Sequence, residues 1–295
     1  MPDIDYHLFQ RQFYIGRVEK KLDDTWQTKP LGNGLILSFS NSLPVVSIQD
    51  KSQNNYIILG VAVQSLDGEP APIDGIEELV DHKQVQELYK SWSGRWVLIV
   101  NDEIHLDATG LLGCYYKIDT HGVEVSSAAS LIVPLGAANT FKLKNQVGAD
   151  YFPLPDSGFE EVHKLMPSQI LNLSSGTIHF RYLQYSLPQL SYEESIAYLG
   201  ELIKITLKNF PALNSQKKLQ LALTAGNDSR VLLAALQASK LPYEIFTFDS
   251  PNINPYDVSI PRSLSKLVGK KHNLVKRKKR RQENFDKFNQ HSGFH

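Results

Sequence analysis

The sequence predicts an α/β protein in two parts, a β-rich first part with antiparallel sheets and a parallel α/β second part. Two observations support this prediction. In the first 150 residues, short apolar runs flank turn-forming segments, as strands do in β-hairpins. From Ser191 onward, helix-like and strand-like segments alternate, which favours a parallel sheet with right-handed crossovers. The expected fold class is therefore α/β plus β-rich.

Hairpin patterns define the first part, domain 1–150. Strands are predicted over residues 34–39, 55–63, 96–100, 104–106, 114–117 and 123–125. The last four form two hairpins around polar turns, and hairpins favour antiparallel sheets. A helix is predicted over residues 80–90, where apolar residues recur at helical spacing among charged ones.

A Pro- and Gly-containing stretch at residues 151–158 ends this part and opens a linker, 151–188, with two short strands. The second domain is expected at 189–295. Ser191 and Glu194 have the spacing of a capping box, which predicts a helix that ends before Pro211. Beyond it we expect a buried strand at 219–223, further strands at 243–248 and 272–275, and helices at 229–238 and 258–268.

Composition excludes several classes of protein. Lys+Arg and Asp+Glu are equal at 31 each, so no net charge draws the chain to nucleic acid or a membrane surface. The single cysteine, Cys114, excludes a disulfide framework and a multi-cysteine metal site, and it fits a reducing cytoplasm. No apolar run approaches the roughly 20 residues that a membrane span needs. We therefore expect a cytoplasmic protein with no membrane partner.

One segment carries recognisable chemistry. The strand at 219–223 leads directly into Thr224-Ala225-Gly226-Asn227-Asp228-Ser229-Arg230 and then into a helix. Backbone N–H groups and the helix dipole at such a turn suit an anion. Gly226 is expected to permit a positive φ, and Thr224 and Ser229 to offer hydroxyls to phosphate. Asp228 could cap the helix or hold Mg²⁺.

This segment resembles the Ser-Gly-Gly-x-Asp-Ser loop of N-type ATP pyrophosphatases, above all that of asparagine synthetases. Thr224 takes the place of the first serine, Ala225 and Gly226 those of the glycines, and Asp228 and Ser229 match. The resemblance implies an ATP-dependent ligase that adenylates a small-molecule or peptide carboxylate and then forms an amide. ATP and Mg²⁺ are the ligands that it implies.

The resemblance extends downstream of the loop. Phe246-Thr247-Phe248-Asp249 lies where the family's second strand ends beside the adenine, and residues 266–272 match its Leu-Gly-x-x-His pattern. Asp257 corresponds to an acidic residue that could contact Mg²⁺ or nucleotide, or could be an ordinary helix N-terminal acid. The implied ATP-binding residues are Leu223, Thr224, Ala225, Gly226, Asn227, Asp228, Ser229 and Phe248, with Asp228 and Asp257 toward Mg²⁺. No catalytic residue and no protein-only metal site is predicted.

Upstream, residues 93–99, 107–113, 115–116 and 126–127 resemble the family's glutamine amidotransferase half, a β-sandwich of the N-terminal nucleophile (Ntn) hydrolase type. That half uses a cysteine directly after the initiator Met, whereas this chain has Pro2, so we expect no glutaminase activity. The family's later pyrophosphate-binding loop and lysine region have no counterpart before His295. A truncated, split or fragmentary synthetase domain is therefore expected, which another polypeptide could complete.

Other interpretations remain open. The loop could be an ordinary βα turn, and the chain a non-catalytic protein that binds a nucleotide or a partner. The basic run at residues 276–281 could bind nucleic acid, although a solvated segment is favoured because no aromatic residue interrupts it. Cys114 is expected to be a buried small hydrophobe. Arg95 and Asp107 are expected to pair or face solvent.

Overall fold

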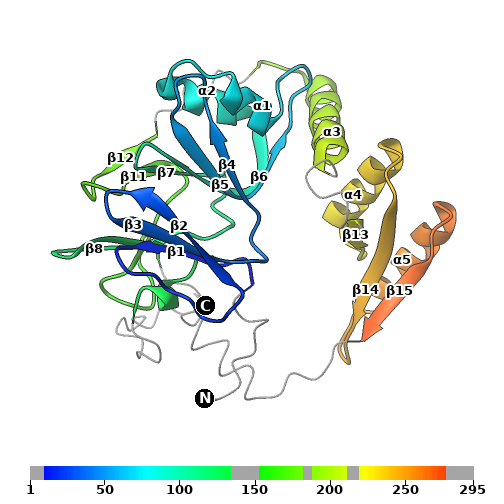
Figure 1. Ribbon diagram of the computed structural model, residues 1–295. Coiled ribbons are helices and arrows are strands. Elements are labelled where there is room, and N and C mark those ends of the chain that lie inside the picture. Colours follow the sequence, from blue (N-terminus) through cyan, green and yellow to red (C-terminus); the bar gives the residue numbers. More distant parts are fainter. Residues whose placement is uncertain (1–9, 134–152, 182–187, 211–218, 277–295) are drawn as a thin grey trace. The chain divides into compact units, whose positions relative to one another are not determined.

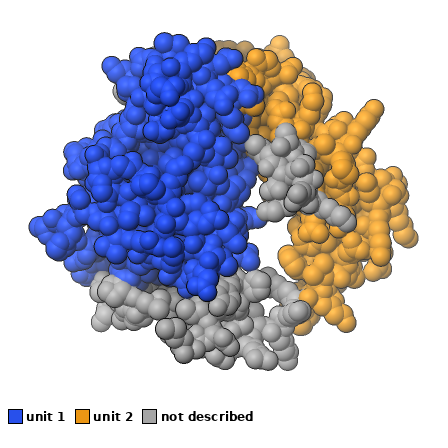
Figure 2. Space-filling view, viewed as in Figure 1, with its two compact units in different colours: residues 1–62, 72–185, 280–295 blue, residues 63–71, 186–279 orange. Residues whose placement is uncertain are grey.

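The computed structural model describes residues 10–133, 153–181, 188–210 and 219–276. These residues form two compact units, shown in two colours in Figure 2. The first unit contains residues 10–62, 72–133 and 153–181, and the second contains 63–71, 188–210 and 219–276. Antiparallel sheets in one unit and a parallel sheet in the other confirm the fold class, α/β plus β-rich.

Two six-stranded sheets form the first unit (Figure 1). The first sheet has the order β10 (His163–Lys164), β8 (Tyr115–Asp119), β9 (Gly122–Ser126), β1 (Phe13–Gly16), β3 (Leu35–Ser40) and β2 (Trp26–Gly32). The second has the order β12 (Ile178–Phe180), β11 (Gln169–Asn172), β7 (Glu103–Leu106), β6 (Trp92–Val100), β5 (Asn55–Gln64) and β4 (Val45–Gln49). Both predicted hairpins, β6–β7 and β8–β9, are confirmed.

The two sheets share one apolar core. Phe13 and Leu37 from the first sheet belong to the same buried cluster as Leu59 and Ile104 from the second. This is the inner layer of a β-sandwich, in which alternate side chains of each strand point inward. The two strands that were predicted inside the linker, β11 and β12, belong to the second sheet, and β10, which was not predicted, is an edge strand of the first.

Short helices cover the other face of the second sheet. They are α1 (Pro72–Glu77), η2 (His82–Gln84), α2 (Val85–Leu88) and η3 (Tyr89–Ser91). Ile76, Val85 and Tyr89 pack there in a cluster that includes Trp96. The helix predicted over 80–90 is therefore confirmed only in part: residues 82–91 are helical, but only 85–88 form α-helix. Asp81 accepts a hydrogen bond from the backbone of Lys83 and starts a 3₁₀ turn, so only one α-turn forms.

A parallel sheet forms the second unit, in the order β13 (Leu219–Ala222), β14 (Tyr243–Asp249) and β15 (His272–Lys276). Its helices are α3 (Tyr192–Asn209), α4 (Asn227–Ala238) and α5 (Tyr256–Leu267). The predicted capping box at the start of α3 is present with both of its hydrogen bonds. Every helix and strand predicted from Ser191 onward is present, to within a few residues at its ends.

One face of this parallel sheet packs against helices. Leu221 and Ile245 lie in a buried cluster with Leu233 and Leu236 of α4. The residues between them on the strands point the other way, and Gln220 is exposed. The prediction of a fully buried strand at 219–223 is therefore wrong. Buried and exposed side chains alternate along this strand, because the described part of the unit places helices on one face of the sheet only.

Candidate functional site

The loop between β13 and α4 is shaped by its own hydroxyl groups. The Thr224 N–H donates to Ser229 Oγ at 3.1 Å, and the Gly226 N–H donates to Thr224 Oγ1 at 3.2 Å. Ser229 Oγ also lies 3.1 Å from the Gly226 carbonyl oxygen. Both hydroxyls that were predicted to meet phosphate thus hold the loop in place between strand and helix.

The N-terminus of α4 provides backbone hydrogen-bond donors that have no partner within the helix. Gly226 is its N-cap and supplies no side-chain cap. The N–H groups of Asn227, Asp228 and Ser229 occupy the first three helical positions, where no carbonyl of the same helix can accept from them. Together with the positive end of the helix dipole, they form a site that suits an anion.

Two details of the predicted loop are wrong. Gly226 has φ −66°, not a positive φ, so any residue could adopt its backbone conformation. Asp228 is not the N-cap, because the extended backbone of Gly226 occupies that position and places Asp228 in the first helical turn. The Asp228 side chain is exposed, and no hydrogen bond or ion pair joins it to another described residue. Its carboxylate is free to meet a cation.

Asp257 fastens the loop from a different element. It lies in the first turn of α5, and its Oδ1 accepts a hydrogen bond of 2.8 Å from the Ala225 N–H. Asp257 is half-buried, so this bond is partly shielded from water. The structure therefore brings Asp257 to the predicted loop as a group that positions it.

Phe248 and Leu223 have different surroundings. Phe248 lies near the C-terminal end of β14, and its ring is 50% exposed and edge-on to Phe246, with centroids 5.1 Å apart. Ala222 pairs with Phe246, so Phe248 lies level with the start of the loop. Ligands of parallel sheets bind at this carboxyl edge. The Leu223 side chain is fully buried, so only its backbone is near the loop surface.

Thr247 and His272 form a polar contact beneath the loop that was not predicted. Thr247 Oγ1 donates to the Leu223 carbonyl oxygen at 2.6 Å and lies 2.8 Å from His272 Nε2. A buried threonine between two phenylalanines in a strand is the sequence signal for such a contact, because a buried hydroxyl needs a partner.

Three residues of the first unit that the sequence singled out, Cys114, Asp107 and Arg95, are buried or hydrogen-bonded within the fold. Cys114 is buried, which raises the pKa of its thiol and confirms that it acts as a small hydrophobe. Asp107 is also buried and accepts from the backbone N–H groups of Trp96 and Thr109. Arg95 donates to the Leu111 carbonyl oxygen at 2.7 Å. Pro2 and residues 277–281 of the basic run lie outside the described residues.

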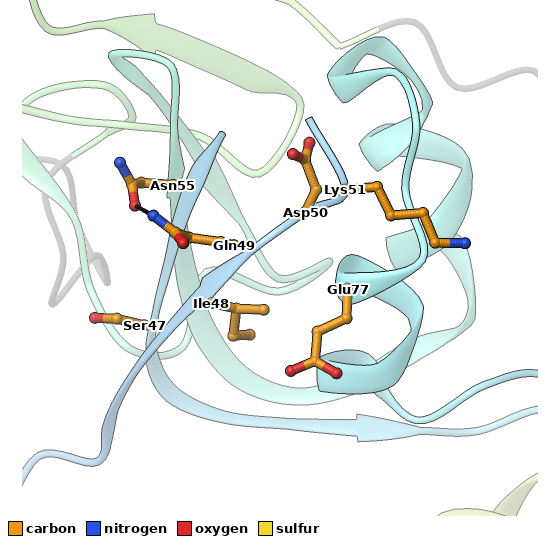
Figure 3. A pocket seen from close by; sticks show the side chains of 7 residues that line it. All are labelled: Ser47, Ile48, Gln49, Asp50, Lys51, Asn55 and Glu77. Carbon is orange, nitrogen blue, oxygen red and sulfur yellow. Dashed lines mark hydrogen bonds between the residues drawn. The ribbon is translucent and has the colours of Figure 1, made fainter. Parts of the chain in front are cut away.

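A cavity of about 570 Å³ lies beside the edge strand β4 (Figure 3). Asp50 is its most buried acid, but it is fully engaged by its own loop. It accepts from the backbone N–H groups of Ser52 and Asn54 and from the Tyr56 hydroxyl. These bonds lower the pKa of Asp50 despite its burial. The carboxylate therefore stabilises the turn after β4 and is not free for a ligand.

A buried histidine cluster lies on the helix-covered face of the second sheet. His105 is fully buried, with Nδ1 3.1 Å from the Tyr89 hydroxyl and Nε2 3.3 Å from a Glu103 carboxylate oxygen. The other oxygen of Glu103 lies 3.6 Å from His179. Burial lowers the pKa of His105, although Glu103 acts in the opposite direction.

We expect this histidine to make the protein sensitive to mild acid. The pKa of His105 is lower in the folded protein than in the unfolded chain, where it is about 6.5. The unfolded chain thus binds more protons as pH falls through about 6.5, and the free energy of unfolding falls with it. Urea denaturation between pH 7.5 and 5.5 should show a smaller loss of stability in His105→Gln. The exposed His121→Gln should follow the parent, and an unchanged profile in His105→Gln would contradict the assignment.

The described residues contain no helix that is both long and apolar enough to cross a membrane. Nor do three or more His, Cys, Asp or Glu side chains converge on a metal-sized position within the described ranges. No protein-family model matches the chain, and no curated protein matches it.

Proposed function

We propose that this chain is an ATP-dependent ligase of the asparagine synthetase type, which adenylates a carboxylate and forms an amide. The observation that supports this best is the loop at residues 224–229. Its helix presents three backbone donors without a helical partner, and α5 fixes the loop through Asp257. Phosphate is the ligand class that such a helix terminus binds most readily.

The residues present fit the magnesium complex of ATP. Mg²⁺ binds through one or two carboxylates together with substrate phosphates, and the exposed Asp228 stands in the first turn of α4 beside the free N–H groups. The half-exposed ring of Phe248 offers a flat apolar surface for the adenine. Magnesium would neutralise phosphate charge when bound.

The proposed reaction has two steps. A substrate carboxylate attacks the α-phosphorus of ATP and releases pyrophosphate, and an amine then displaces AMP to form the amide. The loop contributes by orienting the phosphates and by stabilising their negative charge. In this proposal the first unit has an Ntn-hydrolase-like fold without its nucleophile, so it does not supply ammonia from glutamine. In this proposal the reaction takes place in the cytoplasm.

Asp228→Asn tests the site most directly. We expect the variant to bind MgATP about tenfold more weakly than the parent, because one Mg²⁺ ligand loses its charge. In EDTA, where no Mg²⁺ is available, Asp228→Asn should bind ATP at least as tightly as the parent. The reason is that the Asp228 carboxylate of the parent then repels the phosphates of free ATP. Calorimetric titration of the full chain with ATP, with and without Mg²⁺, measures both.

Glu193→Gln is the matched control. Glu193 occupies the second position of α3, as Asp228 does of α4, and both are exposed. Its removal should leave MgATP binding unchanged. Equal affinities of parent and Asp228→Asn for MgATP, or no binding by the parent, would contradict the proposed site. Binding without pyrophosphate release in the presence of asparagine, glutamate and peptide carboxylates would instead indicate a nucleotide-binding protein without the ligase step.

A further inference from the structure

A basic cavity of about 370 Å³ lies at the junction of α5 and β15 in the second unit. It is lined by Arg262, Ser265, Lys266, Lys270, Lys271, His272 and Leu274. Four of these residues are basic, Arg262, Lys266, Lys270 and Lys271, and none is acidic. The ion pairs of the described residues involve lysines elsewhere in the chain. Within the described part of the protein no acidic side chain pairs with these cations, and Lys270 Nζ lies over the Tyr243 ring, 4.8 Å from its centroid.

Ser265 contributes a hydroxyl without a partner. The residue is 1% exposed, and its Oγ makes no hydrogen bond to another described residue, although buried hydroxyls nearly always have a partner. Its backbone carbonyl accepts from the Lys270 N–H at 2.8 Å, which fixes the C-terminal turn of α5. The cavity wall thus holds a rigidly placed hydroxyl whose hydrogen-bonding capacity is unused.

His272 is held in one orientation at the same cavity. Thr247 has one hydroxyl proton, and it donates this proton to the Leu223 carbonyl oxygen. The contact of 2.8 Å between Thr247 Oγ1 and His272 Nε2 must then be donated by Nε2–H. Burial and the nearby charge of Arg262 lower the pKa of His272. The His272 side chain is therefore neutral when no anion is bound, and a bound anion would favour its protonated form.

An ordinary cause accounts for only part of this cluster. Cations are favoured at a helix C-terminus by the helix dipole, which explains Lys266 in the last turn of α5. Arg262 lies more than a turn before the helix ends, and the dipole leaves the Ser265 hydroxyl unexplained. We propose that this cavity binds a phosphate-sized dianion, orthophosphate or a phosphate monoester, through Arg262, Lys266 and the Ser265 hydroxyl. This site does not depend on nucleotide binding at the 224–229 loop.

Titration of the full chain with inorganic phosphate at low ionic strength tests the proposal. Ser265→Ala should bind phosphate about tenfold more weakly, since one hydrogen bond to a charged group is lost. The variant should fold at least as stably as the parent, because alanine removes an unsatisfied hydroxyl and favours helix. The double variant Arg262→Gln, Lys266→Gln should lose binding. Lys208→Gln, an exposed lysine in α3, should behave as the parent.

Two further arms identify the ligand and the site. Tighter binding of phenyl phosphate than of inorganic phosphate would indicate a monoester, and equal binding would indicate free phosphate. Phosphate bound at the loop should be unaffected by Ser265→Ala, so the component of binding that this variant weakens is the one assigned to the cavity. The proposal is overturned if the parent does not bind phosphate, if Ser265→Ala binds as the parent does, or if only duplex DNA binds with a steep salt dependence.

Discussion

Replacing Asp257 with alanine is expected to loosen the loop after β13 and to weaken MgATP binding strongly. The Ala225 N–H, which donates to Asp257 Oδ1 at 2.8 Å, would be left without a partner in a half-buried position. Loss of a hydrogen bond to a charged group costs about 1.5–3 kcal/mol. Hydrogen exchange should therefore accelerate at Ala225 and in the first turn of α4, and calorimetry should show the loss of affinity.

Asp257→Asn separates two roles for this residue. Asparagine keeps the side-chain oxygen that accepts from Ala225 but removes the negative charge. If Asp257 only positions the loop, the asparagine variant should retain slow exchange and most of the MgATP affinity. If its carboxylate also ligates Mg²⁺, exchange should stay slow while MgATP affinity falls as in the alanine variant. Fast exchange in Asp257→Asn would contradict the positioning role.

Local patterns were sufficient to predict most of the second unit. The capping box at Ser191 and the apolar spacing behind it depend on residues only three or four apart, so α3 can be identified from its own sequence. The same holds for the strand–loop–helix at residues 219–238. The conformation of Gly226 could not be predicted in this way, because which residue becomes the N-cap depends on how the loop closes on Ser229.

Four strands of the first unit were not predicted, β1, β2, β4 and β10, and the last three of these lie at sheet edges. β2 ends the first sheet and contains Lys29 and Pro30 among largely exposed residues. An edge strand pairs on one side only, so it tolerates proline and polar residues and lacks a clear alternation. β4 lies at the edge of the second sheet, and its sequence shows no clear strand pattern for the same reason. The bond from Ala225 to Asp257 spans 32 residues, and no local pattern predicts such a contact.

The largest loss of stability is expected from Gly94→Ala. Gly94 lies in β6 with φ +111°, and a Cβ there would overlap the backbone carbonyl oxygen of Val61 in β5. Backbone cannot move aside as a side chain can, and the left-handed region is itself unfavourable for alanine. Together these effects should lower the free energy of unfolding by about 2–5 kcal/mol, which urea denaturation would measure.

Gly32→Ala separates the two contributions. Gly32 has φ +100°, close to that of Gly94, but nothing lies within 4 Å of its Cβ position. Gly32→Ala should lower the free energy of unfolding only by the cost of the unfavourable backbone conformation, about 1–2 kcal/mol. The difference between the two variants then measures how closely β5 and β6 approach at Gly94. Equal losses would mean that the strands separate at no cost, and the tight pairing at the centre of the second sheet would not contribute to its stability.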